Sequence, residues 1–192
     1  MHEINETDVK IEFHGKETKA KYLDWYQKAK IEGFHGVPGW VIKMDDIFHS
    51  NLGGDLKDFG PLYAFTQSVS SISKGSIGSH EDESAIKFSK ALIVVPATKA
   101  YTKILDKESK RTMVKEIIIQ KLKNVGDTVS IQKEFAYYNG YIDHTEIIAG
   151  KEIAIVFSFN RLRVTENVFS GEGKKTGLVS YEVEVHSGKI SA

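Results

Sequence analysis

Alternation of apolar and polar residues at every second position recurs along this chain and constrains its fold more than any other feature. Residues 180–186 show it most clearly, because Tyr181, Val183 and Val185 fall on one side and polar residues on the other. Residues 128–135 repeat the pattern. Successive side chains of a β-strand point to opposite faces, so this period predicts strands with one buried face.

The same reasoning predicts further strands over residues 9–13, 40–45, 61–68, 85–94, 115–123 and 153–159. The pattern changes phase after Asn160, which predicts a bulge or bend there. Asn139 and Gly140, together with the glycine-rich residues 171–177, supply turn chemistry between the later strands. The chain is therefore predicted to be mainly β, and it lacks the strand–helix rhythm of a nucleotide-binding sheet.

Two stretches have the period of a helix instead. In residues 16–32 the apolar residues form one broad stripe that ends before Gly33. Thr98 can cap a short helix over residues 99–108, whose inward residues are Tyr101, Ile104 and Leu105.

The order of these elements divides the chain into two regions. Residues 1–36 form an N-terminal strand–helix extension, and residues 37–192 form a β-rich domain with one short helix between two runs of strands. Strands that close on themselves in this way suggest a small barrel or a sandwich, and the period alone does not separate the two.

Composition excludes several classes of protein. The 192 residues include no cysteine, which excludes disulfide frameworks, thiolate metal sites, iron–sulfur clusters and cysteine nucleophiles. The formal net charge is zero, which argues against a protein that coats nucleic acid. The first residues are acidic and lack an apolar core segment, and the longest apolar runs are too short to span a membrane. We therefore expect synthesis in the cytoplasm, no cleaved signal peptide and no membrane insertion.

No catalytic constellation is visible in the sequence. The seven histidines form no local metal-binding pair, and the acidic stretches around His80 and His144 are interpreted as solvated polar loops. The serine- and glycine-rich residues 68–79 lack the order of a phosphate-binding loop and lie between two strands, which favours a long inter-strand loop. No cofactor, metal or enzymatic activity is predicted, and function is expected to reside in assembly or binding.

Two alternatives remain open from the residues themselves. One is a β-barrel module that binds a carbohydrate or a small apolar ligand on aromatic side chains, namely Trp25, Trp40, Tyr137, Tyr138 and Tyr141. The other is a metal-dependent hydrolase that gathers histidines distant in the sequence.

The order of elements from Trp40 onward resembles the haemolysin-coregulated protein (Hcp) family, which forms the tube of type VI secretion systems. The resemblance rests on short hydrophobic sequence segments that follow one another in a common order over roughly residues 40–189. Residues 40–45 are similar to the opening strand, residues 62–70 to the second strand, and residues 86–90 to the strand that follows the serine-rich loop. The short helix over residues 97–108, the long late strand over residues 151–164 and the closing strand over residues 177–189 follow in the same order.

The resemblance implies a mainly β fold, an Hcp-like β-barrel of two packed antiparallel sheets with one short flanking α-helix. It implies a homo-hexameric ring that stacks into an expelled tube, meets contractile sheath, spike and baseplate proteins, and carries secreted effectors, with no nucleic-acid partner. Such a subunit is made in the cytoplasm and secreted by the type VI apparatus. The extension over residues 1–36 has no counterpart in a typical member. The ring-stacking role falls by position on residues of the serine-rich loop: Ser70, Ser71, Ile72, Lys74, Ser76, Ile77 and His80.

Overall fold

The computed structural model describes residues 39–45, 47–48, 56, 58–73, 84–125, 128–148, 150–185 and 190–191. The strand predicted over residues 9–13 and the helix predicted over residues 16–32 lie outside these residues. The described elements are β1 (Trp40–Met44), β2 (Gly60–Pro61), β3 (Ala64–Thr66), β4 (Val69–Ser73), β5 (Ser84–Phe88), β6 (Ala91–Pro96), α2 (Ala100–Ser109), β7 (Val114–Val125), β8 (Thr128–Ile148), β9 (Glu152–Ser158), β10 (Arg161–Phe169), β11 (Lys175–Glu184) and β12 (Ile190–Ser191).

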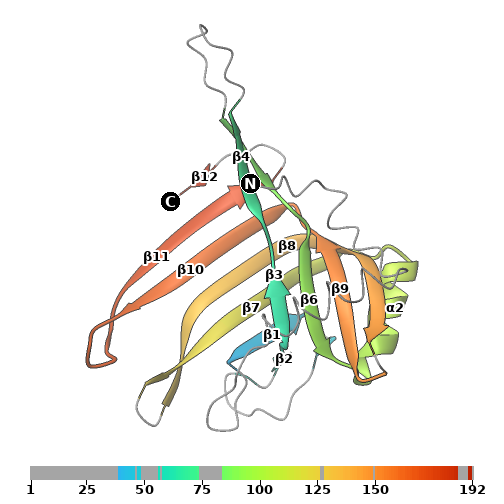
Figure 1. The fold of residues 1–192 in the computed structure, drawn as a ribbon, viewed down its shortest axis with the longest axis horizontal. Helices are drawn as coiled ribbons and strands as arrows, with labels where there is room; N and C mark the ends of the chain where they lie inside the picture. Colours follow the sequence, from blue (N-terminus) through green and yellow to red (C-terminus); the bar gives the residue numbers. More distant parts are fainter. Residues whose placement is uncertain are drawn as a thin grey trace, which may run out of the picture.

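Ten of these strands form one continuous antiparallel sheet that folds over into two layers (Figure 1). The large layer has the order β12-β11-β10-β8-β7-β1-β2, and the small layer runs from the end of β8 through β9 and β6 to β3. The hydrophobic core lies between the layers, and its fully buried side chains include Ile42, Ile93, Ile119, Ile155 and Phe157. The prediction of two packed antiparallel sheets is therefore confirmed.

Strand β8 makes the first corner of the barrel. Its residues up to Tyr138 pair with β10, whereas its residues from Tyr141 onward pair with β9 of the small layer. The prediction of a turn between two strands at Asn139 and Gly140 is therefore wrong, because both residues lie inside this single strand. Asn139 has a φ of +54°, which lets the strand change direction there.

The second corner lies between β2 and β3. The N–H of Leu62 donates to the carbonyl of Trp40 in the large layer, at 3.1 Å, and the N–H of Tyr63 donates to the carbonyl of Val94 in the small layer, at 2.8 Å. With a corner on each side, the strands β8, β7, β1, β2, β3, β6 and β9 close into a barrel.

Strands β10, β11 and β12 extend from the edge of β8 as a wing outside the barrel (Figure 1). The phase change predicted near Asn160 marks the start of this wing. Asn160 donates its N–H to the carbonyl of Tyr138 and accepts from the N–H of Val185, so the chain leaves the small layer and joins the large one at this residue.

Helix α2 packs against β8 and closes the core at the end away from the wing (Figure 1). Lys99, and not the expected Thr98, occupies the N-cap position of α2 and makes no side-chain capping hydrogen bond. The hydroxyl of Thr98 accepts a hydrogen bond from the N–H of Ala100 at 3.2 Å, one residue before that position. Ile104 is fully buried and Tyr101 packs against the core, as predicted. Leu105 is 38% exposed, so the expectation that it faces inward is wrong.

Candidate functional site

No metal centre is present among the residues that the structure describes. No group of three histidine, cysteine, aspartate or glutamate side chains there could hold an ion. His144 lies on β8, one residue after a bulge at Asp143, so the expected polar loop is wrong at this position. Asp143 forms an ion pair with Lys90, with a distance of 3.4 Å between Nζ and Oδ2. The stretch around His80 lies outside the described residues.

The aromatic residues expected to share a ligand surface lie in different places. Trp40 packs against the core, where its ring stacks on Phe135 at 6.2 Å between centroids. Tyr137 is fully buried, and its hydroxyl donates to Oε1 of Gln67 at 2.8 Å. Burial, and to a smaller extent Tyr181, raises the pKa of Tyr137 well above 10.0. Tyr137 is therefore a neutral hydrogen-bond donor of the core.

Tyr138 instead lies at the centre of a polar face on the opposite side of the large layer from the core. The guanidinium of Arg161 lies 4.2 Å from the centre of its ring, and that of Arg163 lies 5.6 Å away. Arg161 also forms an ion pair with Glu182 across the strands, at 3.3 Å. Burial raises the pKa of Tyr138, and the positive charge of Arg163 opposes this rise.

The polar face continues along β8 and β7. Glu134 accepts a hydrogen bond from Nε2 of Gln120 at 2.8 Å and lies 4.0 Å from the guanidinium of Arg163. The cross-strand pairing of β10 and β11 places Thr165 opposite Ser180 on the same face, with their hydroxyls 3.4 Å apart. This face therefore presents paired charges and hydroxyls to water.

The other face of the wing carries an apolar surface. Near the barrel, Leu162 and Val183 of this face are buried in the core. Farther out the same face continues with Tyr181 at 40% exposed, Val168 at 45% and Val179 at 61%. We call these three residues the wing surface. These side chains continue a core-facing row past the end of the core, so they are exposed to water. Exposed apolar side chains that lie together are typical of a contact with another protein.

A cavity of about 360 Å³ borders the wing surface. Val168 and Val179 line it, together with Phe169, and Lys123 places its ammonium 5.0 Å from the centre of the Phe169 ring. Glu166 supplies a carboxylate to the same lining. The cavity therefore combines an apolar wall with one charge of each sign.

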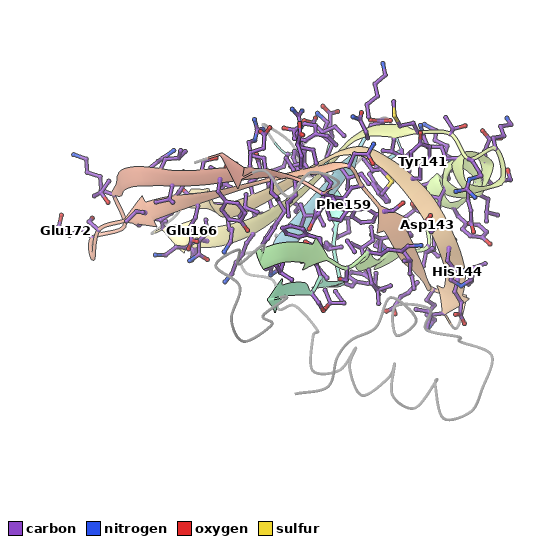
Figure 2. The ribbon with its side chains drawn as sticks, turned by 90° about the horizontal axis from the view of Figure 1, so that it is seen from above. Tyr141, Asp143, His144, Phe159, Glu166 and Glu172 are labelled. Atoms are coloured by element: carbon purple, nitrogen blue, oxygen red, sulfur yellow. The ribbon has the colours of Figure 1, made fainter. Side chains whose placement is uncertain are left out.

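Two apolar side chains near the opposite end of the molecule are partly exposed. Leu105 on α2 and Met113, which follows the helix, are 38% and 39% exposed. We call this pair the helix surface. In Figure 1 the wing reaches the left edge and α2 lies at the right, and Figure 2 places Glu172 at the tip of the wing, far from His144 near the other end of β8.

Some of the residues expected to contribute to ring stacking lie in a strand, and the others lie outside the described residues. Ser70, Ser71 and Ile72 lie on β4, which pairs with β5 in a two-stranded hairpin, rather than in a loop. Figure 1 shows this hairpin projecting from the barrel. The other four expected residues, Lys74, Ser76, Ile77 and His80, lie outside the described part of the chain.

The sequence signals for the wing and helix surfaces were present but incomplete. The alternation in residues 180–186 placed Tyr181 and Val183 on one face, as the structure does. It could not show that the barrel ends between them, which leaves one buried and the other exposed. The partners of Tyr138 come from a different strand, and pairing between strands cannot be read from a period.

No family model matches the sequence, and no curated protein matches it. Solved structures do. A protein described as a type six secretion system protein superposes with a TM-score of 0.69 at 11% identity, over 79% of this chain and 98% of that one. Hcp1 from Salmonella typhimurium gives a TM-score of 0.59 at 9% identity, over 79% and 97% of the two chains.

Hcp3 from Pseudomonas aeruginosa, described as a secreted protein, gives a TM-score of 0.54 at 13% identity, over 76% and 96% of the two chains. In each case nearly the whole of the known chain is matched. At these identities the likeness concerns the fold. Together with the observed barrel, its wing and its flanking helix, it shows that the chain has the fold of the Hcp proteins of type VI secretion.

Proposed function

We propose that the chain is a structural subunit of a type VI secretion tube and not an enzyme. The observation that carries this proposal is the presence of two dissimilar apolar surfaces at opposite ends of one Hcp-like subunit. Dissimilar surfaces pair head to tail, and a head-to-tail contact that closes on itself produces a ring. Six copies per ring is the number that the resemblance to Hcp implies.

In this ring the wing surface of one subunit meets the helix surface of the next. Fully burying an exposed valine or leucine contributes about 1.5–3 kcal/mol, so a few such residues can anchor a contact. Val179, the most exposed apolar residue of the wing surface, is the central anchor. The neighbouring cavity has room for an unbranched apolar side chain such as Met113.

Stacking of rings is assigned to the projecting hairpin and the chain that joins its strands. Val69, at the base of β4, is 56% exposed, which supports a contact outside the subunit. The residues proposed to take part are Ser70, Ser71, Ile72, Lys74, Ser76, Ile77 and His80.

The polar face is assigned to the channel of the tube. Its paired groups, such as Arg161 with Glu182, tolerate contact with water in a channel. Secreted effectors would travel there, and sheath, spike and baseplate proteins would meet the outside and ends of the tube. No described helix is long and apolar enough to cross a membrane. We propose that the subunit is made in the cytoplasm and leaves through the apparatus.

The test compares two neighbouring residues on β11. Val179→Lys places a charge on the wing surface, whereas Leu178→Lys places one on the opposite face of the same strand, where the native side chain is 57% exposed. The molar mass of each protein is measured by size-exclusion chromatography with multi-angle light scattering at equal concentrations. We expect a hexamer for the native chain and for Leu178→Lys, and a monomer for Val179→Lys.

Circular dichroism checks that both variants remain folded, which is expected because neither residue is in the core. Equal loss of the hexamer in both variants would assign the effect to charge on the strand in general. A hexamer in both would remove the wing surface from the interface.

A further inference from the structure

The face of the large layer that carries the wing surface also carries an excess of positive charge. Strand pairing places Lys121 directly opposite Lys133, and Lys133 opposite Glu166. Glu166 in turn lies opposite Val179 of the wing surface. Lys123 follows Lys121 by two residues on β7, and side chains two apart on a strand share a face. These residues therefore bring three positive charges and one negative charge to the face of the wing surface.

The negative charge in this group is already paired. Glu166 forms an ion pair with Lys133, with 3.3 Å between Oε2 and Nζ. Lys123 forms no ion pair with any residue that the structure describes, and its ammonium lies 5.0 Å from the centre of the Phe169 ring. An aromatic ring attracts a cation but does not neutralise it. Lys123 therefore keeps a charge that the described part of its own subunit does not balance.

Lys123 belongs to the wall of the cavity beside the wing surface. Val168 and Val179 of the wing surface line the same cavity, which has a volume of about 360 Å³. Interfaces between proteins place opposite charges across from each other. An apolar wall beside an unpaired ammonium therefore fits a segment that brings an apolar side chain and a carboxylate close together.

The helix surface has such a carboxylate beside it. Glu108 follows Leu105 by three residues in α2, so the two side chains are neighbours on one side of the helix. Met113 follows Glu108 by five residues. Among the described residues Glu108 forms no ion pair, whereas Asp106, the other acidic residue of α2, pairs with Lys110.

Glu108 is also unfavourably placed within its own subunit. It lies in the last turn of α2, where the negative end of the helix dipole repels a carboxylate. Two lysines of the same helix are engaged elsewhere, since Lys107 pairs with Asp45 and Lys110 pairs with Asp106. A cation from another subunit would remove this repulsion.

We propose that Glu108 of one copy forms an ion pair with Lys123 of the next copy, across the head-to-tail contact of the ring. This inference rests on the proposed function, because it takes the wing surface of one subunit to meet the helix surface of the next. One of the two charges lies beside each surface, and each lacks an opposite charge among the described residues of its own subunit. The ion pair fixes the register of the contact, which small apolar surfaces alone specify poorly.

The test reverses each charge in the full chain. Lys123→Glu and Glu108→Lys each bring like charges together at every contact of the ring, so we expect subunit association at least about 100-fold weaker than in the native chain. The molar mass is measured by size-exclusion chromatography with multi-angle light scattering, over a dilution series. Circular dichroism checks folding. Glu108→Lys should fold at least as well as the native chain, because a lysine is favourable in the last turn of a helix.

Two combinations of the variants restore the opposite charges. The double variant, Lys123→Glu with Glu108→Lys, exchanges the charges within one chain. An equal mixture of the two single variants can close a ring in which the variants alternate, because six is an even number and the contacts run head to tail. Every contact of that ring again joins opposite charges. We expect hexamers from the double variant and from the mixture at concentrations where neither single variant forms them.

Lys43→Glu is the matched control. Lys43 is half-buried, and it follows the core residue Ile42 on β1, so it lies on the opposite face of the large layer. We expect this variant to remain a hexamer, and its dissociation would assign the effect to net charge and overturn the ion pair.

Two further results would overturn the ion pair while the ring stands. One is that Lys123→Glu and Glu108→Lys both remain hexamers as stable as the native chain. The other is a loss of hexamer that neither the double variant nor the mixture repairs. A native chain that is itself monomeric would overturn the ring and, with it, the ion pair.

Discussion

Asp45 joins three elements through one carboxylate. It follows β1, and its Oδ1 accepts from the N–H of Glu116 at 3.2 Å while its Oδ2 accepts from the N–H of Lys115 at 3.3 Å, both at the start of β7. Lys107 of α2 reaches the same Oδ2 at 3.4 Å. Asp45 also has a φ of +41°, which aspartate tolerates better than alanine. Replacing Asp45 therefore removes several interactions at once.

The cost of Asp45→Ala can be estimated from these contacts. Hydrogen bonds to a charged acceptor contribute about 1.5–3 kcal/mol, and their lengths here favour the lower part of that range. The left-handed backbone adds about 1 kcal/mol for alanine. The half-buried pair with Lys107 adds about 0.5 kcal/mol. The free energy of unfolding is expected to fall by about 4–5 kcal/mol for Asp45→Ala. It is expected to fall by about 1 kcal/mol for Asp45→Asn, which keeps an acceptor oxygen and tolerates the backbone.

Urea unfolding at one protein concentration measures both values. The matched control is Asp106→Ala, which removes an exposed ion pair between Asp106 and Lys110 within α2. Such a pair is worth about 0.3–0.5 kcal/mol. The reasoning is refuted if Asp45→Ala costs no more than Asp106→Ala, because the carboxylate would then not hold the three elements together.

Three further predictions concern the core and the corner of β8. Tyr137→Phe should lower the free energy of unfolding by about 1 kcal/mol at pH 7, because Gln67 loses its hydrogen-bond donor. The raised pKa of Tyr137 means that the folded state keeps a proton which the unfolded chain releases above its ordinary pKa of 10.0. The free energy of unfolding of the native protein should therefore fall as the pH rises above about 10, and that of Tyr137→Phe should fall less over the same range. Urea unfolding midpoints at several pH values measure both. An equal fall in the two proteins would contradict this explanation. A Cβ on Gly140 would lie 3.1 Å from the carbonyl oxygen of Ser158 and 3.3 Å from Cδ1 of Ile117, so Gly140→Val should cost about 1–3 kcal/mol in thermal or urea unfolding. An unchanged stability would show that the corner does not need glycine.

The sequence predicted most strands because one face of each is buried in the same core. Residues 40–44 and 153–158, for example, carry an alternation that survives in β1 and β9. Periodicity describes a single strand, however, and the corners of the barrel depend on two partners. Asn139 and Gly140 have the composition of a turn, but hydrogen bonds to β7 and β9 on either side keep them within one strand.

The same limit explains why the wing surface and the helix surface were not predicted. Tyr181 and Val183 are equivalent in the sequence pattern, since both are apolar residues on the same face of one strand. Only the position of the barrel edge makes Val183 buried and Tyr181 exposed. Conversely, the resemblance in element order held because the order of the described strands and of α2 follows from the local pattern alone.

We propose that this chain closes into six-membered rings. Negative-stain electron microscopy of the purified full-length protein tests it most directly, because class averages report both ring closure and symmetry. The account predicts rings with sixfold symmetry that are lost in Val179→Lys and kept in Leu178→Lys. Single subunits at high concentration, or rings of another symmetry, would contradict it.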